Sequence, residues 1–113
     1  MFSPAPSARP VVTEYDKLVR DRIPEICHEN GETPVTHVET GEDYRERLRA
    51  KLCEEAAEFR ESGDPEELAD VLEVLAAIRH AEGFEREELE RLREQKAEER
   101  GRFEDGIVLE RVE

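Results

Sequence analysis

Apolar residues recur at helical spacing in the middle and the C-terminal half of the chain. Residues 42–61 carry one apolar stripe, and residues 65–82 carry a second stripe of Leu, Val and Ile. Between them, Asp64 is a candidate N-cap and Pro65 fits the first turn of a helix. A third, mostly polar helix is expected over residues 85–100. The pattern therefore predicts an antiparallel helix pair followed by a solvated helix.

Prolines and β-branched residues set the expectations outside these helices. Residues 1–13 contain three prolines and predict a flexible tail, whereas residues 14–113 are expected to form a single helical domain. Near the start of that domain, Pro24 is expected to interrupt a short or broken helix. Strand-like segments at 34–39 and 106–112 predict a small β-ribbon. The expected fold class is all-α, an antiparallel helical bundle with this ribbon beside it.

Composition narrows the classes of partner. The chain has 113 residues and a formal net charge of −14, which argues against binding the phosphate backbone of nucleic acid. No apolar run approaches the length of a membrane span, and the first residues lack the pattern of a signal peptide, so a cytoplasmic protein without a membrane partner is expected. Few large apolar residues are available for a core. We therefore expect a homodimer or homotetramer, which would bury the helix faces.

One carboxylate does not fit a solvated helix face. Leu48, Leu52, Glu55 and Phe59 follow one another by steps of four, three and four residues, so Glu55 lies inside the apolar stripe. A buried carboxylate costs several kcal/mol unless it is paired or binds a metal. Three solutions are open: a wet edge of the bundle, a divalent cation, or an arginine partner. The nearby arginines are Arg47, Arg49 and Arg60.

Three further carboxylates lie at the boundary that the two helices share. Glu58 follows Glu55 by nearly one turn, and Glu67 and Asp70 have the same spacing on the next helix. Four carboxylates from two helices, with no His or Cys among them, suit Mg²⁺ or Mn²⁺. The sequence therefore offers Glu55, Glu58, Glu67 and Asp70 as metal ligands.

Basic residues near both ends of the helical region are candidate phosphate ligands. Lys17, Arg20 and Arg22 precede the helix pair, and Lys96 and Arg100 follow it. Such cations could hold a polyphosphate beside a metal ion. Ordinary surface ion pairing is the alternative explanation for each of them.

Over about residues 15–112, three motifs resemble those of a known family, the MazG-like all-α nucleotide pyrophosphohydrolases. Within that family, the chain resembles the phosphoribosyl-ATP pyrophosphohydrolase-like branch. The first is YDKLVRDRIPEI at 15–26. The second combines KLCEEAAE at 51–58 with ELADVLEV at 67–74, and it resembles the family's EExxE and ExxD metal motif. The third is KAEERGRF at 96–103.

The resemblance implies Mg²⁺-dependent hydrolysis of a nucleoside triphosphate, or a related nucleotide, at the α–β phosphate bond, with clearance of non-standard nucleotides as one role. Glu55 and Glu58 would be catalytic as well as metal-binding, and Glu54 and Asp21 would support them from a second shell. By motif position, the substrate-binding residues would be Lys17, Arg20, Lys96 and Arg100.

Two other functions stay open. One is the phosphoribosyl-ATP pyrophosphohydrolase step of histidine biosynthesis, whose enzyme resembles this chain in its helical metal site. The other is a non-catalytic nucleotide-binding or protein-interaction module, in which the acidic residues only confer solubility.

Overall fold

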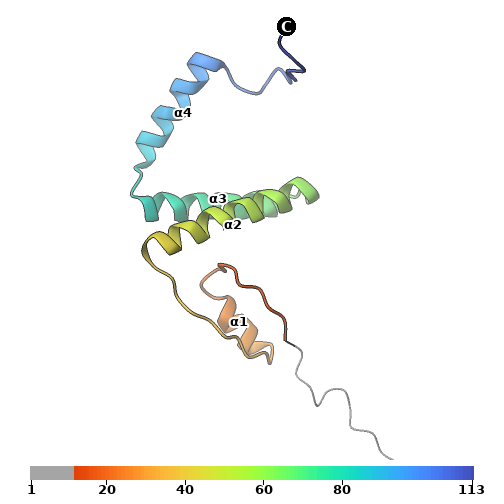
Figure 1. Ribbon diagram of the computed structural model, residues 1–113, viewed down its shortest axis with the longest axis vertical. Helices are drawn as coiled ribbons and strands as arrows, with labels where there is room; N and C mark the ends of the chain where they lie inside the picture. Colours follow the sequence, from red (N-terminus) through yellow and green to blue (C-terminus); the bar gives the residue numbers. More distant parts are fainter. Residues whose placement is uncertain (1–11) are drawn as a thin grey trace, which may run out of the picture. The chain divides into compact units, whose positions relative to one another are not determined.

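Four α-helices make up the regular structure of the described part of the chain. The computed structural model describes residues 12–113, so the tail predicted for residues 1–13 lies almost entirely outside the described range. The helices are α1 (Ile23–Glu29), α2 (Gly41–Ser62), α3 (Pro65–Glu82) and α4 (Arg86–Arg100) (Figure 1). No strand occurs in residues 12–113. The all-α prediction is confirmed, and the ends of the three long helices fall within one residue of the predicted positions.

The chain divides into two compact units, with the boundary inside α2 between Lys51 and Leu52. The prediction of a single domain over residues 14–113 stays a prediction. In the first unit, Pro24 lies in the first turn of α1 instead of interrupting a helix. Proline is tolerated there because the first helical N–H groups have no partner within the helix. Asn30 ends this short helix, and Gly31 follows with φ +81°.

The predicted β-ribbon does not form. Residues 34–39 and 106–112 are both irregular. Val35 and Val38 are 94% and 89% exposed, and their odd and even positions would place them on opposite faces of a strand. Neither face of such a strand would be consistently apolar, and a two-stranded ribbon is marginal in water unless it packs on something. The expectation was wrong because it relied on β-branched residues alone.

The second unit contains a helix hairpin made by the C-terminal half of α2 and by α3 (Figure 1). Gly63, with φ +69°, closes α2 by donating its N–H to the carbonyl of Phe59 at 2.7 Å. Asp64 is the N-cap of α3, as predicted, with Pro65 in the first turn, although the Asp64 side chain makes no capping hydrogen bond. Gly83 ends α3 in the left-handed conformation. The short connection holds the ends of α2 and α3 together.

Very little of the described chain is buried. Leu48 and Val74 are the buried apolar residues, and Glu55 is the buried charged one. The helical wheel therefore placed Glu55 correctly among the apolar positions of α2. None of the helices within residues 12–113 has the length and apolar content that crossing a membrane requires.

Candidate metal centre

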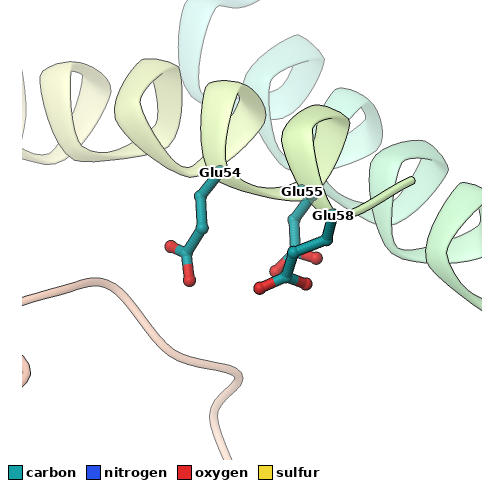
Figure 2. A group of neighbouring side chains, drawn as sticks. All are labelled: Glu54, Glu55 and Glu58. Carbon is teal, nitrogen blue, oxygen red and sulfur yellow. The ribbon is translucent and has the colours of Figure 1, made fainter. Parts of the chain in front are cut away.

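Three carboxylates project from adjacent turns of α2. Glu54 and Glu58 are one turn apart, and Glu55 lies beside them, so all three side chains point to the same side of the helix (Figure 2). One carboxylate oxygen from each residue lies within 4.8 Å of the others. Glu54, which was expected to support the ligands, lies in one group with Glu55 and Glu58.

α3 contributes the second half of the acidic cluster. Glu67 and Asp70, nearly one turn apart on α3, form a group with Glu55 in which one oxygen of each residue again lies within 4.8 Å of the others. Glu55 belongs to both groups. The helix hairpin thus brings together all four predicted metal ligands and Glu54 around one shared residue.

Glu55 is the most enclosed member of this cluster. Its exposed fraction is 7%, and its Oε2 atom is shielded from solvent without a hydrogen-bond partner in the described structure. The residue does interact with its neighbours through polar or electrostatic contacts. A shielded carboxylate oxygen without a hydrogen bond is costly, and coordination of a cation is one of the few ways to compensate it.

The electrostatics of the cluster also favour a cation. A hydrogen bond with Glu55 raises the pKa of Glu58 above its usual value of 4.5, and the negative charge of Glu55 adds to this effect. Partial burial and the neighbouring Glu67 raise the pKa further. Carboxylates gathered this closely disfavour one another's charge. A bound divalent cation would remove that penalty.

The donor set fits a hard metal ion. Both groups consist of carboxylate residues, without His or Cys. Octahedral coordination at about 2.1 Å separates neighbouring oxygens by about 3 Å and opposite ones by about 4.2 Å. The side-chain oxygens of each group lie within 4.8 Å of one another, which is close to these separations. The residues present therefore fit an ion such as Mg²⁺ or Mn²⁺.

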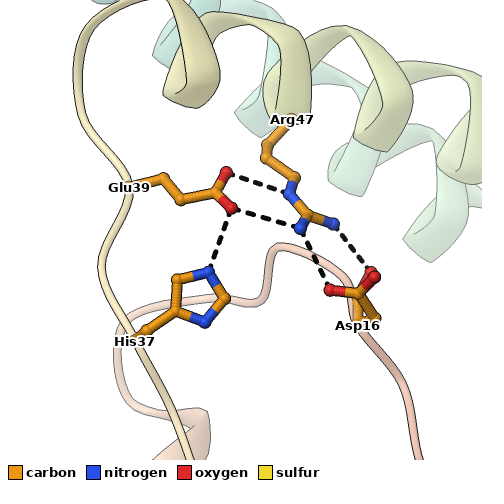
Figure 3. A network of polar contacts seen from close by, with 4 residues as sticks. All are labelled: Asp16, His37, Glu39 and Arg47. Carbon is orange, nitrogen blue, oxygen red and sulfur yellow. Dashed lines mark hydrogen bonds and ion pairs between the residues drawn. The ribbon is translucent and has the colours of Figure 1, made fainter.

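Two of the three arginines considered as partners for Glu55, Arg47 and Arg60, form no ion pair with it in the described part of the chain. Arg47 pairs with Glu39 at 2.9 Å and with Asp16 at 3.0 Å (Figure 3). Arg60 makes no ion pair within the described part of the chain. Arg49 pairs with Glu42 and Glu46 on its own helix. Neither Arg47 nor Arg60 therefore neutralises Glu55, which weakens the arginine-partner explanation.

The predicted cationic residues are not members of the acidic cluster. Lys17 and Arg20 lie in the irregular segment before α1, where the Lys17 ammonium stands 5.7 Å from the centre of the Tyr15 ring. Lys96 and Arg100 are exposed on α4 and form no ion pair with any residue from 12 to 113.

Asp21, predicted to support the metal ligands, is exposed in the turn that leads into α1 and belongs to neither acidic group.

Comparisons with known proteins give one partial relative. An uncharacterized protein of Mycolicibacterium smegmatis is 50% identical over 44 residues, which is 39% of this chain and 45% of that protein. The chain thus covers less than half the length of this relative. No protein-family profile matches the sequence. No solved structure matches it either.

Proposed function

We propose that the protein is a divalent-cation-dependent nucleotide pyrophosphohydrolase of the MazG-like type. It would hydrolyse a nucleoside triphosphate, or a related nucleotide, at the α–β phosphate bond and release a monophosphate and pyrophosphate. The observation that supports this most is the cluster of five carboxylates from α2 and α3 around the buried Glu55. The sequence motifs that resemble this family contain the same residues.

In this proposal Glu55, Glu58, Glu67 and Asp70 hold Mg²⁺, with Mn²⁺ as a substitute, and Glu54 joins them as a ligand or supports them. The bound ion would neutralise phosphate charge and lower the pKa of a coordinated water. Glu55 and Glu58, which belong to the same group, would also fix the position of the attacking water. The water oxygen would form a bond to phosphorus as the bond between that phosphorus and the bridging oxygen breaks, and the proton that the water loses would pass to a nearby carboxylate and then to solvent.

The basic residues would bind the substrate. A polyphosphate carries several negative charges, and lysine and arginine side chains offer donors that match phosphate oxygens. Lys96 and Arg100 are exposed and unengaged within residues 12–113. Lys17 and Arg20 would contribute from the segment before α1. A nucleotide substrate would be met in the cytoplasm, where we place the protein.

A homo-oligomer, a dimer or a tetramer, is part of the proposal. α3 directs Val74 inward, yet Leu68, Leu72 and Leu75 remain 45%, 64% and 45% exposed at steps of four and three residues. A helix with apolar residues on two sides is normally covered on both. We expect light scattering after gel filtration to show an oligomer that Leu72→Glu dissociates. A monomeric wild-type chain would contradict this part of the proposal.

The central experiment measures products from a panel of nucleotides. Purified protein is incubated with Mg²⁺ and standard, deaminated or oxidised nucleoside triphosphates, and pyrophosphate and monophosphate are quantified separately. We expect both products in equal amounts, with the loss of activity in Glu55→Gln. Glu61→Gln is the matched control, because Glu61 is an exposed residue of α2 outside both acidic groups.

The same experiment distinguishes the alternatives. Turnover of phosphoribosyl-ATP without turnover of any triphosphate would favour the step in histidine biosynthesis. Absence of turnover on every nucleotide, with Mg²⁺ bound, would favour a non-catalytic module and overturn the proposal.

A further inference from the structure

Arg47 joins two irregular segments to α2. Its guanidinium donates to both carboxylate oxygens of Glu39, at 2.9 and 3.1 Å, and to the carbonyl oxygen and Oδ1 of Asp16, at 2.8 and 3.0 Å (Figure 3). His37 adds a contact to Glu39 at 3.0 Å. Asp16 lies 31 positions before Arg47 in the sequence, and Glu39 lies 8 positions before it. We call the contacts among Asp16, Glu39 and Arg47 the Arg47 clamp.

The geometry of the clamp is typical of a specific interaction rather than of a chance ion pair between surface residues. Arginine's planar fork matches a carboxylate in two-point contact, and here it also reaches a backbone carbonyl. The Arg47 and Glu39 side chains are 30% and 23% exposed, so solvent screens their interaction less than that of a fully exposed pair, whereas the Asp16 side chain is 80% exposed and is held by the additional bond from Arg47 to its carbonyl. By contrast, Arg45 forms an ion pair with Glu42, and Arg49 forms ion pairs with Glu42 and Glu46, all of them residues of α2.

Asp16 shows that the clamped backbone has an unusual conformation. Among the described residues, Asp16 is the only non-glycine residue with a positive φ, which is +43°. This conformation is less favourable for aspartate than for glycine, and the contacts with Arg47 help to hold it in place. Arg47 binds both the carbonyl and the carboxylate of this residue. No regular secondary structure fixes the segment from residue 12 to residue 20.

We propose that Arg47 is a positioning residue that fixes the segment carrying Lys17 and Arg20. Asp16 immediately precedes Lys17, so holding the carbonyl of Asp16 restricts the peptide unit that the two residues share. Fixing this segment in the free protein would lower the entropy lost when its basic side chains bind phosphate. This consequence for the substrate rests on the proposed function, whereas the fastening of the segment does not.

Limited trypsin digestion tests the fastening without any nucleotide. Trypsin cleaves after Lys17 and Arg20 only when the segment can adopt an extended conformation in the protease. We expect Arg47→Ala to speed cleavage at these two bonds at least about fivefold, as measured by mass spectrometry. Arg93→Ala is the control, because Arg93 pairs with Glu90 on its own helix. Unchanged cleavage in Arg47→Ala, with helical circular dichroism preserved, would overturn the proposal.

A second variant guards against general unfolding in Arg47→Ala. Asp16→Asn removes the charge, and asparagine tolerates positive φ. This variant should also speed cleavage after Arg20, and at that bond the double variant with Arg47→Ala should be no faster than Arg47→Ala alone. Additive effects would show that Arg47 does not act through Asp16.

Steady-state kinetics with the nucleotide that turns over tests the consequence for the substrate. We expect Arg47→Ala to raise KM at least about fivefold while kcat changes less than about twofold, because the lost order affects binding rather than the metal ligands. Arg47→Lys, which keeps the charge but lacks the fork, should also raise KM. Faster trypsin cleavage with unchanged KM would refute the positioning role. If the wild-type protein turns over no nucleotide, the proposed function fails, and the trypsin experiment still decides the fastening.

Discussion

At the scale of single residues, Glu55 combines two demands that normally exclude each other. It occupies an apolar position on α2, about two turns after the buried Leu48 on the same face, and it carries a carboxylate with a shielded oxygen. A side chain chosen for the stability of the hairpin alone would be apolar at this position. The proposed cation would account for a carboxylate at this position.

This conflict predicts opposite effects of one substitution with and without metal. In EDTA, Glu55→Met should stabilise the protein by about 1 kcal/mol, since it replaces a shielded carboxylate with an apolar side chain of similar size. In Mg²⁺, the wild-type protein should gain thermal stability and the variant should not. Thermal unfolding in EDTA and in Mg²⁺ measures both effects, with Glu61→Gln as the control. A loss of stability in EDTA would mean that Glu55 stabilises the fold without any metal.

Glu39 gives the clamp a pH dependence. Hydrogen bonds from Arg47, and then from His37, lower the pKa of Glu39 from its usual value of 4.5. A carboxylate whose pKa is lowered on folding stabilises the native state above its unfolded pKa, and this contribution disappears as pH falls through the lowered pKa. Urea unfolding between about pH 6 and pH 3 should therefore show a smaller loss of stability below pH 4.5 in Glu39→Gln than in the wild type. Equal losses would contradict the assignment.

At the scale of elements, the sequence predicted the long helices and the carboxylates on them well. Their apolar period is regular, and Pro65 and Gly83 mark helix ends by local chemistry that needs no distant partner. The position of Glu55 followed from the same period. Residues that depend on local rules could thus be placed from the sequence.

Elements that depend on distant contacts could not be predicted in the same way. Asp16 meets Arg47 across 31 positions without any periodic signal, so the clamp was missed and Arg47 was considered as a partner for Glu55. Pro24 was read as a helix breaker, although the same residue suits a helix start. The two segments that were expected to form the ribbon contain β-branched residues, but their Val and Ile side chains are exposed.

The connection between α2 and α3 allows a test at this scale. Gly63 has φ +69°, and a Cβ built there meets no atom within 4 Å, so an added side chain would strain the backbone without a clash. Gly63→Ala should lower the free energy of unfolding by about 1 kcal/mol, and Gly63→Asn should cost less because asparagine tolerates this conformation. Urea unfolding measures both. If both variants lose the same free energy of unfolding, the positive φ of residue 63 is not the cause of the loss.

At the scale of the whole molecule, charge dominates. The formal net charge is −14, and the ion pairs that the structure describes on α2 and α4 include several between residues three positions apart, which are individually weak. Self-repulsion among the remaining acids therefore destabilises the folded chain at low ionic strength.

Salt should relieve that repulsion. Raising NaCl from about 0.1 to about 1 M shortens the screening length from about 10 to about 3 Å, so the urea midpoint of the metal-free protein should increase. Urea unfolding at several salt concentrations in EDTA measures this change. A midpoint that falls with salt would show that the local ion pairs outweigh the net repulsion.

The local origin of the acidic cluster also bears on the order of folding. All five carboxylates come from residues 54–70, which form two helical segments joined by one tight turn. Contacts between residues so near in sequence close quickly, because little chain entropy is lost in forming the loop. During synthesis this segment is complete before α4 and the last residues have been added. A cation captured at that stage would act as a folding nucleus, so Mg²⁺ should accelerate refolding of the chain in addition to stabilising the finished structure.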